Sequence, residues 1–159
     1  MRARLTLAAA MIAVSPSFAS AQPQGRPRIA VSVEARTEGR AEPDATAAQL
    51  LAEVRRSLAA LDDVDLVARE GSRRTIWIIA GATPGATAAS MIVTERYDRE
   101  TLMVLGIEDD DMAFRMMALQ IVTDHQIFTG RDTADVARRI VAALDGGVFA
   151  KLRALPPRP

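Results

Sequence analysis

The sequence predicts an α+β fold: a mixed four- to five-stranded sheet with helices packed mainly on one face. Residues 28–35 and 64–69 have strand patterns and flank a helical pattern at 45–61, which is the order of a parallel strand-helix-strand unit. Further strand patterns follow one another directly between residues 74 and 107, and the last third of the chain has helical patterns. Together these stretches predict a strand-helix-strand unit, a strand meander and two C-terminal helices.

The first strand and the first helix are defined by their periodicity. Ile29, Val31 and Val33 alternate with more polar positions, as in a half-buried strand. The helix at 45–61, for which Asp44 is an expected N-cap, has apolar residues at spacings of three and four. The residues expected on its buried face are Ala47, Leu50, Leu51, Val54, Leu58 and Leu61.

Three strands are expected between residues 74 and 107. Residues 74–82 form a continuous apolar run rich in branched side chains, which is typical of a central strand. Trp77 lies within this run and is expected to be a core residue. Residues 89–97 alternate between apolar and polar side chains, and residues 101–107 are expected to complete the meander.

Two helices are expected to complete the domain. The first spans residues 112–128, ends before Gly130 and follows the acidic run 108–111. Carboxylates in that position are suited to cap the free amides of a helix rather than to bind a cation. Asp132 or Thr133 is expected to open the second helix. The residues expected on its buried face are Val136, Ile140, Val141 and Leu144.

The amino terminus has the features of a cleavable secretory signal peptide. Arg2 and Arg4 precede an apolar run at residues 5–14, and small residues lead up to Ala21. A membrane-spanning helix needs about 20 apolar residues, so this run is too short to be an anchor. We expect cleavage between Ala21 and Gln22, a periplasmic or secreted product, and no transmembrane anchor in the mature chain.

The chain is thus expected to comprise a signal peptide at 1–21, a flexible lead-in at 22–27, a single α+β domain at 28–155 and a Pro-rich tail at 156–159. The 20 basic residues do not exceed the 20 acidic ones, so a nucleic acid is not an expected partner. The absence of cysteine excludes a disulfide framework and thiol chemistry. With 49% hydrophobic but only 4% aromatic residues, the core is expected to consist mainly of aliphatic side chains and methionine.

No residue pattern predicts a catalytic, cofactor-binding or metal-binding site, so we expect no cofactor and no enzymatic activity. His125 is the only histidine and follows Asp124 in the predicted helix at 112–128. Adjacent helical residues point about 100° apart, so Asp124 is poorly placed to orient His125 as a general base. The serines lie outside any G-x-S-x-G nucleophile motif.

The segment 112–122 is unusual because its only polar residues are Arg115 and Gln120. A helix that is apolar on most sides is buried on more than one side. One interpretation is that the last helix covers the second side. The other is an adaptable interface, since unbranched methionine side chains repack readily against different partners. The candidate partner interface consists of Met112, Phe114, Met116, Met117 and Leu119.

Three short stretches resemble the amino-terminal α/β domain of the periplasmic Tol-Pal protein family TolB. They are residues 28–31 at the first strand, 58–61 leading into 64–67 at the end of the first helix and the second strand, and 137–140 continuing to 146–149 near the carboxyl end. The β-propeller that follows this domain in that family has no counterpart in the sequence. The resemblance implies a small periplasmic α/β interaction domain without catalysis.

These observations predict an exported, non-catalytic binding or accessory domain of the cell envelope. Its expected partner is another protein or a second copy of the chain, contacted through the segment 112–122 or an exposed strand edge. The alternative is a periplasmic small-molecule binding protein with its pocket between the sheet and the C-terminal helices.

Overall fold

The computed structural model describes residues 28–36, 45–83 and 85–155. The predicted signal peptide, the lead-in, the Asp44 cap and the Pro-rich tail lie outside these described residues.

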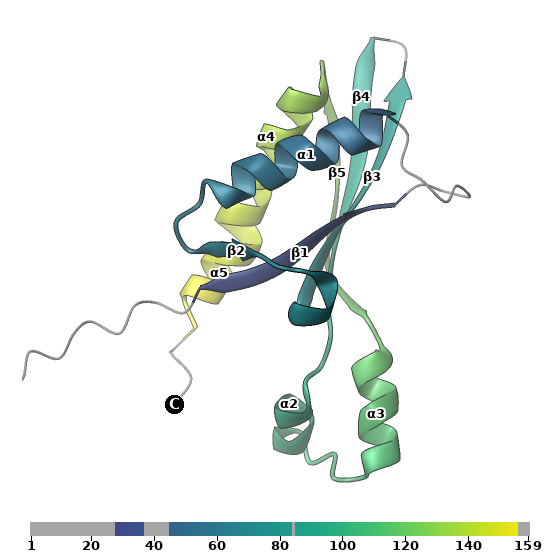
Figure 1. The fold of residues 1–159 in the computed structure, drawn as a ribbon, viewed down its shortest axis with the longest axis vertical. Coiled ribbons are helices and arrows are strands. Elements are labelled where there is room, and N and C mark those ends of the chain that lie inside the picture. Colours follow the sequence, from purple (N-terminus) through teal and green to yellow (C-terminus); the bar gives the residue numbers. More distant parts are fainter. Residues whose placement is uncertain (1–27, 37–44, 84, 156–159) are drawn as a thin grey trace, which may run out of the picture.

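The described residues form a five-stranded mixed sheet (Figure 1) with the strand order β2-β1-β3-β4-β5. β1, β2 and β3 are parallel to one another, whereas β4 is antiparallel to both β3 and β5. The strands are β1 (Ile29–Ala35), β2 (Val64–Leu66), β3 (Arg74–Thr83), β4 (Ala86–Glu95) and β5 (Ile121–Gly130).

Two long helices, α1 (Ala45–Ala59) and α4 (Thr133–Ala143), pack against each other and on one face of the sheet (Figure 1). The chain continues from α4 through a π-helical turn, η2 (Leu144–Phe149), into α5 (Ala150–Arg153). This arrangement confirms the predicted α+β class and the predicted strand-helix-strand unit. We call the face that α1 and α4 cover the helical face, and the opposite side the second face.

The main core lies between the helical face and these two helices. The side chains that are 0% exposed include Val31 on β1, Ile76 and Ile78 on β3, and Met91 on β4. They alternate with residues on the second face because successive strand residues point to opposite sides of a sheet. From the helices and η2, the core receives Leu50, Val54, Leu58, Val136, Ile140, Leu144 and Phe149.

Trp77 is not a core residue, so the prediction for it is wrong. It lies between Ile76 and Ile78 in sequence, and strand alternation therefore places it on the second face. There it is half-buried, its indole N–H donates to the Thr94 hydroxyl at 3.1 Å, and the Arg69 guanidinium lies 5.0 Å from the ring centroid. Arg69 belongs to η1 (Arg69–Gly71), a short turn between β2 and β3.

The strand expected at residues 101–107 is a helix, α2 (Arg99–Val104). Asp98 accepts a hydrogen bond from the Thr101 N–H at 2.7 Å, which starts the helix, and Gly106 adopts a positive φ of 79° just after its end. The apolar run between these two residues is too short for periodicity to separate helix from strand. The helix cap and the glycine decide the outcome.

The helix expected at residues 112–128 is also wrong over its second half. The chain forms α3 (Asp110–Ala118), adopts an extended conformation at Leu119, and continues as β5. The first part has good helix formers such as methionine and alanine, whereas β5 begins with the β-branched residues Ile121, Val122 and Thr123. β5 also supplies backbone hydrogen bonds to β4, which a helix in this place could not provide.

Candidate interaction site

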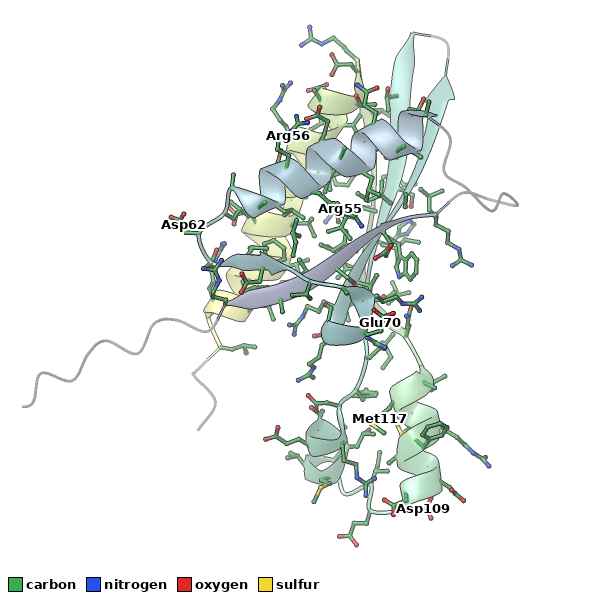
Figure 2. The ribbon with its side chains drawn as sticks, in the orientation of Figure 1. Arg55, Arg56, Asp62, Glu70, Asp109 and Met117 are labelled. Atoms are coloured by element: carbon green, nitrogen blue, oxygen red, sulfur yellow. The ribbon has the colours of Figure 1, made fainter. Side chains whose placement is uncertain are left out.

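The candidate site is a pair of short helices that projects beyond one end of the sheet (Figure 1). We call residues 98–120, which contain α2 and α3, the apolar lobe. In Figure 2, Asp109 lies at the tip of this lobe and Met117 lies at the end of α3 that is nearer the sheet. The lobe is inserted between β4 and β5, two strands that pair directly with each other.

Local hydrogen bonds define the ends of both helices in the lobe. The Asp109 carboxylate accepts from the Met112 N–H at 2.7 Å and caps α3, which confirms the capping role predicted for the acidic run 108–111. At the end of α2, Gly106 N–H donates to the Met103 carbonyl and Ile107 N–H donates to the Leu102 carbonyl, each at 2.9 Å. These two bonds form a Schellman motif, which requires a left-handed residue at Gly106.

The two helices have a very small interior of their own. Leu102 is 0% exposed and Ala113 is 1% exposed, and neither belongs to the main core cluster. Arg99 on α2 forms an ion pair with Asp110 on α3 at 2.6 Å. Arg73, just before β3, forms an ion pair with Asp98 at 2.6 Å and so links the lobe to the sheet. The lobe is therefore held by a small apolar interior together with helix caps and two ion pairs.

All five candidate interface residues lie on α3 or at its C-cap. Phe114 is 72% exposed, Leu119 is 56% exposed and Met112 is 54% exposed, whereas Met116 and Met117 are half-buried. α4 packs on α1, β4 and β5 and leaves the α3 surface exposed. The interpretation in which the last helix covers the second side of this segment is therefore wrong.

Sequence reasoning missed the contribution of α2 to the same lobe. Met103, Val104 and Leu105 are 61%, 83% and 58% exposed, although the sequence placed them in the last strand of a meander. Val122, at the start of β5, is 58% exposed as well. The signal that was available is the combination of Asp98 and Gly106, which are typical of the two ends of a short helix.

A hollow of 270 Å³ lies where the apolar lobe meets the sheet. Met117 lines it together with Glu70 of η1, which Figure 2 labels at the near end of the sheet. Arg96, also in the lining, already donates to the carbonyls of Arg69 and Ser72 at 2.5 and 2.8 Å. Arg73, the other arginine of the lining, is paired with Asp98, so the hollow joins an apolar side chain of α3 to a polar wall whose two arginines already have partners.

A wider hollow of 530 Å³ lies at the corner between β5 and α4. Asp135 on α4 lines it and forms ion pairs with Arg138 at 3.2 Å and Arg139 at 3.4 Å. Burial raises the pKa of the Asp135 carboxyl, but the Arg131 N–H and the two guanidinium groups outweigh burial and hold this pKa below its ordinary value. The space between the sheet and α4, where the alternative function requires a pocket, is filled by core side chains.

The remaining group with possible chemistry is His125, which lies on β5 rather than on a helix. Its Nε2 atom lies 2.8 Å from the Ser90 hydroxyl on β4, and both side chains are on the second face. A serine activated by histidine also needs a group that orients the base and donors for an oxyanion. Neither Ser90 nor His125 lines either hollow, so the pair is best explained as a cross-strand hydrogen bond.

Among the residues that the structure describes, no cluster of three or more acidic or histidine side chains is arranged to hold a metal ion. Within the same part of the chain, no helix combines the length and apolar character needed to cross a membrane.

Comparison with known proteins identifies no family for this chain. No protein-family model matches it, and no curated protein matches it. Among solved structures, it is similar to the hypothetical protein CT253 from Chlamydia trachomatis, with a TM-score of 0.47 and 12% sequence identity over 77% of this chain and 99% of that chain.

Proposed function

We propose that this protein is an exported, non-catalytic domain of the cell envelope that binds another protein through the apolar lobe. The observation that carries the proposal is the exposure of large apolar side chains on both helices of the lobe, with Phe114 at 72% and Val104 at 83%. Single exposed apolar residues are common, but a concentration of them marks a contact surface.

The chemistry of the lobe suits a protein partner. Phe114 supplies a rigid aromatic anchor, and aromatic residues are enriched in the cores of interfaces. Met103 and Met112, one on each helix, are exposed and flexible enough to adapt to an irregular surface. The carboxylates of residues 108–111 surround the tip with negative charge, which favours a partner whose contact surface has an apolar centre and a basic rim.

The proposed location in the envelope rests on the signal-peptide pattern of residues 1–21 and on the resemblance to the amino-terminal domain of TolB. Both features lead to the same compartment. A cysteine-free chain is compatible with it, because the core described above provides stability without disulfides.

The test compares what the mature protein and its variants retain from envelope extracts. Phe114→Asp and Leu119→Asp place a charge on the exposed side of the lobe and should abolish capture of any partner that wild-type protein retains. Leu155→Asp is the matched control, because Leu155 is 63% exposed but follows α5, outside the lobe. Circular dichroism should show that all three variants are folded. Equal capture by wild type and both lobe variants would show that the lobe is not the binding surface.

A further inference from the structure

The two edges of the sheet differ greatly. β2 forms one edge and has three residues, whereas β5 forms the other edge and has ten. Proteins commonly protect an edge strand by making it short or by placing lysine or proline on it. β5 contains neither lysine nor proline, and among the described residues its only strand partner is β4. The bulge at Thr123 interrupts only the first part of β5, and the long edge that follows is a template for pairing with another strand.

The backbone direction along β5 follows from the hydrogen bonds of the inner strands. The Arg96 N–H donates to the Arg73 carbonyl at 2.9 Å. The backbone N–H and C=O groups of even-numbered residues of β4 therefore point toward β3, and those of odd-numbered residues point toward β5. Ala89, Met91 and Val93 therefore bond to Phe128, Gln126 and Asp124. After the register shift at Thr123, the residues of β5 whose N–H and C=O groups point away from β4 are His125, Ile127 and Thr129.

These three outward residues are self-complementary in one antiparallel register. If Ile127 lies opposite Ile127 of a second copy, His125 lies opposite Thr129 in both directions. Each such pair exchanges two N–H···O bonds, which gives roughly six hydrogen bonds across the edge. The register also leaves out Thr123, the extra residue where the pairing of β5 with β4 shifts.

The side chains fit the same register. Ile127 is 72% exposed on the second face, and the register places it against its own counterpart, a favourable contact between β-branched residues. On the helical face, Asp124 lies opposite Gly130 of the second copy and next to the Arg131 that follows. Neither the Asp124 carboxylate nor the Arg131 guanidinium forms an ion pair among the described residues. The pairing brings Asp124 of each copy to the corner of the other copy that Arg131 lines together with Asp135 and Arg139.

We propose that the protein forms a two-fold symmetric dimer through antiparallel pairing of β5 with β5 of a second copy, centred on Ile127. The two five-stranded sheets then form one continuous sheet, with α1 and α4 of both copies on the same side. This surface is separate from the exposed side of α3, so the inference does not depend on the partner proposed for the lobe.

The first test is the oligomeric state of the mature chain, measured by sedimentation velocity over a concentration series. Wild type should shift from monomer to dimer as concentration rises. Ile127→Lys places two like charges opposite each other at the two-fold axis and should remain monomeric. Phe114→Asp, on the lobe, should dimerise like wild type. A wild-type chain that stays monomeric at every concentration overturns the proposal, as does a dimer that survives Ile127→Lys.

The second test examines the register through Asp124, whose carboxylate accepts a hydrogen bond from Gln126 at 3.0 Å, and Arg131. In Asp124→Arg alone, two arginines face each other at each contact, and in Arg131→Asp alone, two aspartates do. Because like charges repel, each variant should be monomeric. An equimolar mixture of these two variants restores both opposite-charge pairs and should form a one-to-one dimer. Thermal melts establish that each variant is folded. Folded variants that dimerise separately, or a mixture that stays monomeric, would exclude this register.

Discussion

The loss of stability on truncating each of two phenylalanines should show how the apolar lobe differs from the main core. Phe149 is 0% exposed at the end of η2, whereas Phe114 is 72% exposed on α3. Truncation of a fully buried phenylalanine to alanine costs about 3–5 kcal/mol, because the transfer free energy and the contacts around the cavity are both lost. This is a large part of the total stability of about 5–15 kcal/mol that is typical of such domains.

The same substitution at Phe114 should cost far less. With 72% of the residue exposed, only about a quarter of the transfer free energy of a buried side chain is lost, or about 0.4–0.8 kcal/mol. Alanine is also the better helix former by roughly half a kcal/mol, which offsets most of this loss. Urea denaturation of Phe149→Ala and Phe114→Ala measures both values. A loss of several kcal/mol for Phe114→Ala would refute the reasoning, because it would mean that the protein itself buries this face of α3.

Three further predictions concern single positions. Because the folded pKa of Asp135 is below its ordinary value, the carboxylate stabilises the fold at neutral pH and loses this effect as the pH falls through the folded pKa. Asp135→Asn should therefore lower the melting temperature at pH 7 but have a diminishing effect below about pH 4; a constant difference across this range would contradict the pKa shift. Gly106→Ala should destabilise by about 1–2 kcal/mol, since only backbone strain is added, whereas Gly146→Ala, with no positive φ, should be neutral or stabilising. The intact mass of the protein from a periplasmic extract should equal that of a chain that begins at Gln22. A mass that includes residues 1–21 would remove the basis for the proposed export.

The sequence predicted those parts of the fold in which one hydrophobic pattern extends over a whole element. The helix at 45–61 and the central strand at 74–82 are both present within one or two residues. The continuous apolar run at 74–82 predicted the strand but concealed which of its residues face the core, so Trp77 was assigned to the wrong face. A run of consecutive apolar residues does not indicate which side chains point to which face of the sheet.

The segment between β4 and β5 could not be predicted in the same way. Its helices α2 and α3 contain six and nine residues, so α2 is shorter than two turns, α3 is only slightly longer, and neither has a complete periodic pattern. The apolar residues at 112–122 also belong to two different elements, a helix and a strand, that meet near Leu119. The candidate interface was found because its unusual composition is local, whereas the pairing of β4 with β5 depends on residues far apart in the sequence.

The insertion of the apolar lobe between two paired strands makes it a replaceable cassette. Glu95 and Ile121 are direct cross-strand partners, so the chain leaves the sheet and returns to it at neighbouring points. We expect that replacing residues 96–120 with a two-residue Asn-Gly turn leaves a simple hairpin between β4 and β5, with the loss of the hydrogen bonds that Arg96 donates to the carbonyls of Arg69, Ser72 and Arg73. Loops from other proteins can be grafted at the same two points, and the sheet with α1 and α4 then serves as a scaffold on which binding surfaces can be exchanged.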